Sequence, residues 1–174
     1  MAMIKNPIDV VAACGLALGA VFGMAGTFVA QPNLQALLWA IDSVGLVTAA
    51  ALLALKYFRT GDDVVAGGFL VFAIAEAVIL SGTAAGPAAS VPSFAAGTAL
   101  WASALLLISI PKQFAFPVRL LGLASAILFA ITAARIFSGE QLLPTAAPLP
   151  FYAYPFLVMT FVGWIWSPLR EVEP

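Results

Sequence analysis

The sequence contains no histidine and a single cysteine, Cys14, and these two scarcities exclude several kinds of site. Without histidine there can be no haem held through imidazole, no histidine-containing zinc site and no histidine-based acid–base catalysis. One cysteine cannot form an internal disulfide or a cysteine-cluster metal site. We therefore predict no cofactor and no metal, and the redox compartment cannot be read from the cysteine content.

Charge is also scarce. Only 9% of the 174 residues are charged, against about 25% in a typical soluble domain. Hydrophobic residues make up 63% of the chain, and the mean hydropathy is +1.09. The net charge of −1 argues against nucleic acid as a partner, because phosphate binding needs clustered lysine and arginine. The composition predicts an integral membrane protein whose main partner is the lipid bilayer.

Patterns typical of enzymes are missing from the sequence. There is no nucleophile–base pair at motif spacing and no phosphate-cradling loop of the Walker type. Asp42 and Glu76 could form a catalytic carboxylate dyad, but the residues around them match no intramembrane hydrolase pattern. We predict no catalytic residue, and the sequence leans against an enzyme without excluding one.

The apolar residues form six segments, each near the roughly 20 residues that a spanning helix needs. Helix start signals support two of them: Asn6-Pro7 precedes the first, and Asp62-Asp63 opens the third. The fold class is therefore an all-α membrane protein, a single membrane-embedded domain over residues 1–174 with helical hairpins 8–58, 64–110 and 116–166. The predicted segments are Ile8–Ala30, Leu34–Phe58, Val64–Ala84, Val91–Ile110, Phe116–Phe137 and Phe151–Trp166.

The distribution of basic residues predicts the orientation. With six spans the loops alternate between the two sides, and arginine and lysine concentrate on the cytoplasmic side. On the side opposite the N-terminus only Arg135 occurs, inside a predicted span. We predict that the N-terminus and the C-terminus are both cytoplasmic, in a plasma or inner membrane. The basic residues on the N-terminal side are Lys5, Lys56, Arg59, Lys112, Arg119 and Arg170.

An internal repeat relates the second hairpin to the third at an offset of 57 residues. Glycine and proline matches carry most weight, since these residues mark fixed backbone requirements. The sequence thus predicts three parallel hairpins. Internal repeats are common in transporter folds, although duplication of a generic hairpin with no transport role would produce the same sequence match. The matches include Phe72-Ala73-Ile74 with Phe129-Ala130-Ile131, Ser81-Gly82 with Ser138-Gly139, Pro87 with Pro144, and Pro111 with Pro168.

Three ionisable residues, Asp42, Glu76 and Arg135, lie inside predicted spans, where a charge normally faces a partner or a wet cavity. With the helical rise of about 1.5 Å per residue, all three fall at a similar level in the outer half of the membrane. We predict that they meet in a ligand-binding site, Arg135 hydrogen-bonded to one of the carboxylates. In the alternative, Glu76 and Arg135 merely neutralise each other, Arg135 partly extends outward, and Asp42 bonds to Ser43 or to a helix end. Further polar atoms are expected from Ser43, Thr83, Thr98, Trp101 and Thr132.

These features leave two functions open. The first is a transporter-like or small-ligand-binding membrane protein, whose excess carboxylate would suit proton-coupled movement of a solute. The second is a non-catalytic accessory or scaffold subunit of a larger membrane complex. A water-filled cavity that reaches Glu76 would favour the first, and an apolar flank without a cavity would favour the second.

The first span carries a stripe of glycines at spacings of four, four and three residues, which lets another helix approach closely. The partner is either a helix of the same chain or, in a homo-oligomer, a helix of a second copy. Cys14, beside this stripe, is expected to be a buried small hydrophobe. The stripe consists of Gly15, Gly19, Gly23 and Gly26.

Overall fold

The structure, a computed structural model, describes residues 6–170, with side chains up to position 167. The prediction of an all-α protein is confirmed, and each predicted apolar segment corresponds to a helix. A short 3₁₀ turn, η1 (Phe151–Ala153), leads directly into the last helix. The helices in the described range are α1 (Pro7–Phe28), α2 (Pro32–Thr60), α3 (Asp63–Thr83), α4 (Val91–Ser109), α5 (Phe116–Phe137) and α6 (Tyr154–Arg170).

Local sequence signals account for several helix ends. The Asn6 side chain accepts a hydrogen bond from the backbone N–H of Ile8 at 3.1 Å, and Pro7 occupies the first turn of α1, as predicted. Gly61 ends α2 at a φ of +83°, a left-handed conformation that glycine adopts without steric cost. This compact cap allows α3 to begin only two residues later, at Asp63.

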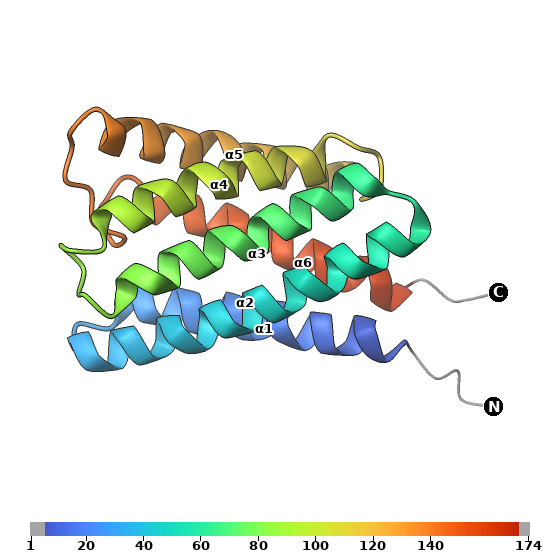
Figure 1. Cartoon of the computed structure of the whole chain (residues 1–174), viewed down its shortest axis with the longest axis horizontal. Helices are drawn as coiled ribbons and strands as arrows, with labels where there is room; N and C mark the ends of the chain where they lie inside the picture. The colour runs from blue at the N-terminus through green and yellow to red at the C-terminus, as the bar shows by residue number, and fades with distance from the viewer. Residues whose placement is uncertain (1–5, 171–174) are drawn as a thin grey trace.

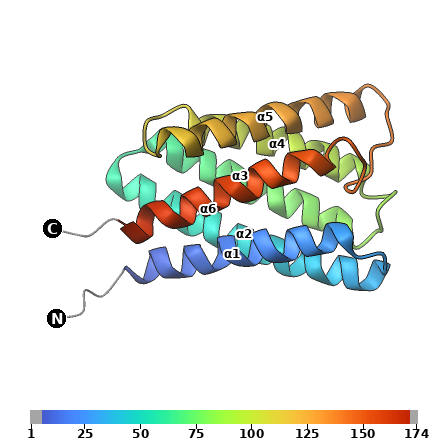
Figure 2. The ribbon, with the colours of Figure 1, turned by 180° about the vertical axis from the view of Figure 1, so that it is seen from behind.

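The helices form one closed bundle. Each helix packs against its neighbours along the chain, and α6 also packs against α1. Successive helices run in opposite directions, so that both ends of the described chain lie at the same end of the bundle (Figure 1). Figure 2 shows α6 from behind, between α5 and α1. We call the end at which the described chain begins and ends the terminal end, and the opposite end, with residues 29–31, 84–90 and 138–150, the distal end.

Five of the helices, α1 to α5, are long and apolar enough to cross a membrane. The apolar part of the sixth, together with η1, runs from Phe151 to Ser167 and is shorter. Large apolar side chains also point outward from the bundle, as a lipid environment requires: Phe116 is 71% exposed and Phe28 68%. The chain is therefore a polytopic membrane protein.

A cluster of aromatic rings fills the bundle toward the terminal end. Phe69 has no exposed surface and stacks on Tyr57, with ring centroids 5.6 Å apart. Its ring also meets Trp164 edge to face at 4.9 Å and Phe114 at 6.3 Å. We call these four residues the aromatic cluster. It closes the interior of the bundle between the terminal end and the middle of α3.

The glycine stripe of α1 faces α2 of the same chain. A Cβ atom on Gly15 would lie 2.5 Å from the carbonyl oxygen of Gly45 and 2.9 Å from the Cβ of Ala49. The intramolecular alternative thus accounts for the whole stripe, and a homo-oligomer would have to use another surface. The α2 side chains that face the remaining glycines are Leu46 at Gly19, Asp42 at Gly23 and Trp39 at Gly26.

The expectation for Cys14 is wrong, because this side chain is exposed. Helix α1 buries the face that carries Gly15 and Gly19 against α2. Cys14 precedes Gly15 by about 100° of helical rotation, which turns its thiol away from α2 and toward the surroundings of the bundle.

Candidate functional site

A cavity of about 220 Å³ lies inside the distal half of the bundle. Its walls come from α1, α2, α3, α4 and α6, whereas no described residue of α5 lines it. Two of the connecting segments at the distal end also contribute, through Pro87 and Pro144. These segments therefore fold back over the bundle.

Asp42 and Glu76 meet at this cavity. Glu76 is only 1% exposed, and its Oε2 accepts a hydrogen bond from the Ser43 hydroxyl at 3.4 Å, a long contact. The two carboxyl groups lie close enough that their charges would repel each other with both groups ionised. Oδ1 of Asp42 and Oε1 of Glu76 are both buried, and neither has a hydrogen-bond partner in the described part of the chain. The walls of the cavity thus hold two buried acceptors that lack a donor among the described residues.

Gly23 provides the space that the Asp42 side chain occupies. A Cβ atom at Gly23 would lie 3.0 Å from Oδ2 of Asp42 and 3.1 Å from its Cγ. A larger residue would push the carboxylate away from α1, because contacts this short are tighter than ordinary van der Waals distances. One member of the glycine stripe therefore serves the cavity as well as the packing of α1 on α2.

Trp101 forms part of the cavity wall from α4. Its ring stacks on Phe72 with centroids 6.1 Å apart and meets Phe129 edge to face at 4.9 Å. The indole N–H interacts with the Glu76 carboxylate but does not complete a hydrogen bond of good geometry. Aromatic packing on both sides fixes the indole, which holds an unpaired donor next to the two carboxylates.

Tyr154 is a cavity residue that the sequence analysis missed. Its hydroxyl donates a hydrogen bond to the carbonyl oxygen of Pro144 at 2.8 Å, which ties residues 138–150 to the start of α6. Both residues line the cavity. Tyr154 lies among aromatic residues near the start of the last predicted span, a position typical of tyrosines at a membrane interface, so the sequence carries no signal for a cavity residue here.

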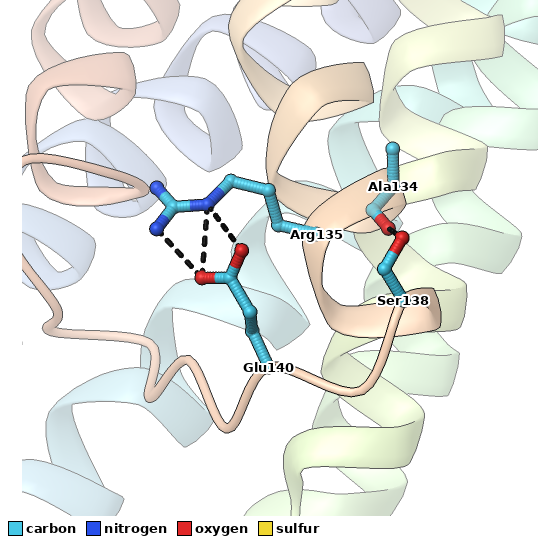
Figure 3. A network of polar contacts seen from close by, with 4 residues as sticks. All are labelled: Ala134, Arg135, Ser138 and Glu140. Carbon is cyan, nitrogen blue, oxygen red and sulfur yellow. Dashed lines mark hydrogen bonds and ion pairs between the residues drawn. The ribbon is translucent and has the colours of Figure 1, made fainter.

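Arg135 does not pair with either cavity carboxylate, and the prediction that it would do so is wrong. Its guanidinium binds Glu140, with an NH2–Oε2 distance of 2.6 Å and both Nε–Oε distances at 3.0 Å (Figure 3). The two side chains are 37% and 46% exposed. Arg135 lies only two residues before the end of α5, so its long side chain reaches Glu140 in the following segment. Hydrogen bonding to Arg135 lowers the pKa of the Glu140 carboxyl.

Of the other predicted site residues, Thr132 lies outside the cavity and Trp101 lines it. Thr132 is fully buried on α5, where its hydroxyl donates to the carbonyl oxygen of Leu128 at 2.9 Å. Thr98 likewise bonds within its own helix, to Phe94. Threonine hydroxyls often satisfy themselves in this way inside helices, and such a hydroxyl is not free for a ligand.

A double-mutant cycle tests the separation of Arg135 from the cavity. The effects of Glu76→Gln and Arg135→Gln on the melting temperature in detergent should add, because the two residues share no partner. As the control, Glu76→Gln and Ser43→Ala should not add, since these side chains share a hydrogen bond. Clear coupling between Glu76 and Arg135 would contradict the separation.

No protein-family model, curated protein or solved structure matches this chain.

Proposed function

We propose that this protein is transporter-like and binds a small ligand in the distal cavity, with Asp42, Glu76 and Trp101 as contact residues. The observation that carries the proposal is the pair of carboxylates on the cavity wall, each with a buried oxygen that has no hydrogen-bond partner within the described residues. A charge at membrane depth costs about 2.5–3.5 kcal/mol on insertion scales, which a purely structural protein has no reason to bear. An accessory subunit remains the alternative, since it needs apolar flanks but no polar cavity.

The proposal includes six spans with the distal end outside. Residues 151–170, from η1 through α6, give about 30 Å of helix, close to the thickness of the hydrocarbon core. Arg119 supports this orientation near the terminal end, where it donates to the carbonyl oxygens of Ser109 and Ile110. Lys5 lies outside the described residues, as does the side chain of Arg170.

Cysteine labelling tests the orientation. In a Cys14→Ala background, Arg59→Cys and Lys112→Cys should react only with reagents that reach the cytoplasm. Ala88→Cys and Thr145→Cys, in the distal segments, should react with an impermeant reagent added outside. The native thiol has to be removed first because it is exposed. Outside labelling at position 59 or 112 would reject the six-span arrangement.

The proposal also retains the duplication of the second and third hairpins. Phe72 and Phe129, which match at the 57-residue offset, both pack on Trp101. In an experimental structure, residues 64–111 should superpose on 121–168 with Pro87 over Pro144. A superposition that works only in inverted orientation would show that the sequence match was accidental.

Transport would require more than this cavity. The aromatic cluster fills the bundle on the terminal side of it, and Phe161 on the cavity wall contacts Trp164 of that cluster. A solute could cross only if these rings separated. A protein that merely binds its ligand needs no such opening, so the movement of the aromatic cluster distinguishes the two variants of the proposal.

The decisive experiment asks whether water and small solutes reach the cavity from the distal side. In the Cys14→Ala background, Ser43→Cys should react with a small impermeant methanethiosulfonate reagent added outside, because thiols react as thiolates in water. Val44→Cys is the matched control: it has the same depth on the same helix, but Val44 is 59% exposed on the outer surface of the bundle. If both thiols are equally inert and another protein co-purifies, the accessory-subunit alternative is the better one.

A further inference from the structure

The charges at the cavity are one-sided. Asp42 and Glu76 both line it, and among the residues that the structure describes no lysine or arginine does. Arg135, the basic residue that the sequence places nearest to the height of the two carboxylates, binds Glu140 outside the cavity. The mutual repulsion of the two carboxyl groups is therefore not relieved by any described cation of the chain. The missing positive charge has to come from a proton or from a ligand.

The free polar atoms set the hydrogen-bonding character of the ligand. Oδ1 of Asp42 and Oε1 of Glu76 are two unpartnered acceptors against one unpartnered donor, the Trp101 N–H, while Oε2 of Glu76 is contacted by Ser43. A protonated amine carries up to three donors around one positive charge and can satisfy both free oxygens. An anion or a neutral acceptor would meet the same oxygens with no donor to offer.

Five aromatic residues also line the cavity, and they favour an organic cation over a metal ion. Trp39, Phe94 and Tyr154 line the cavity together with Trp101 and Phe161. Aromatic faces attract ammonium groups through their quadrupole and are poor ligands for metals. Calcium takes about six to eight oxygen ligands and magnesium about six. Within residues 6–170, no group of three or more metal-binding side chains is gathered.

We propose that the cavity binds a small organic cation, with an ammonium group between Asp42 and Glu76 and an apolar body against the aromatic wall. This inference rests on the proposed function and specifies its ligand. The cavity volume of about 220 Å³ is below the roughly 300–1,000 Å³ of pockets for drug-sized molecules, so the ligand is small.

Three probes of the same shape and different charge test the proposal: 2-phenylethylamine, which is protonated at neutral pH, 2-phenylethanol and 3-phenylpropionate. Binding to the full chain in detergent is measured by calorimetry and by the shift in melting temperature. The amine should bind at least about tenfold more tightly than the alcohol, as a charge-assisted hydrogen bond would give, and the carboxylate should not bind.

The matched variants connect this preference to the two carboxylates. Asp42→Asn and Glu76→Gln should each bring the amine affinity down to that of the alcohol, whereas Glu140→Gln, outside the cavity, should leave it unchanged. Melting temperatures without ligand show which variants are folded, and one folded cavity variant suffices. If the alcohol binds as tightly as the amine, the cavity is a ligand site but its carboxylates hold protons, and the cation proposal is wrong. If no probe binds and Ser43→Cys is inert, the proposed function also fails.

Discussion

Phe69→Ala should cost about 2 kcal/mol or more in the free energy of unfolding, measured by sodium dodecyl sulfate titration in mixed micelles. The side chain has no exposed surface and lies between Tyr57, Phe114 and Trp164. Lipid tails are as apolar as the bundle interior, so the loss of stability comes from lost packing and the resulting cavity rather than from exposure to water.

The matched control is Phe116→Ala, which removes the same atoms from a side chain that is 71% exposed. This change should have little effect, because lipid or detergent fills the vacated space. Equal losses for Phe69→Ala and Phe116→Ala would mean that the aromatic cluster is not packed as described.

Gly15→Ala should destabilise the bundle by about 1–3 kcal/mol, although alanine favours a helix more than glycine does. The added methyl group would meet the backbone carbonyl of Gly45 at 2.5 Å, and a backbone cannot rotate away as a side chain can. Helices α1 and α2 would have to separate.

Gly67→Ala is the opposite case and serves as the control. Nothing lies within 4 Å of a Cβ atom at Gly67, so only helix propensity acts, and stability should rise by up to about 1 kcal/mol. Melting temperatures of the two variants in the same detergent provide the comparison. A Gly15→Ala protein as stable as the Gly67→Ala protein would rule out the close approach of α1 and α2.

The sequence predicted the helices well because the relevant signals are local. The extent of α5 was predicted to the residue, and Asn6 caps α1 as expected. Asp42 and Glu76 were predicted to lie at a similar height along their helices, and both line the same cavity. Both occupy the middle of long helices, where the position along the chain translates directly into depth.

The same reasoning failed for Arg135 because depth does not determine direction. Helix α5 does not line the cavity, and only tertiary packing decides which face of a helix points inward. The rotation of α5 also explains why Thr132 lies elsewhere. The contact between Tyr154 and Pro144 depends on how a proline-rich segment returns to the bundle, and no local periodicity encodes that path.

The contact face between α1 and α2, here called the seam, links the packing of the bundle to the position of a cavity carboxylate. Gly15 and Gly23 lie on one face of α1, the first against the backbone of Gly45 and the second against the carboxylate of Asp42. Rigid helices transmit displacement along their length, so a rotation or slide of α1 that alters one contact alters the other. Substitutions along this seam should therefore shift bundle stability and carboxylate position together. A side chain at Gly15 would therefore disturb helix packing, and one at Gly23 would disturb the geometry of the cavity as well.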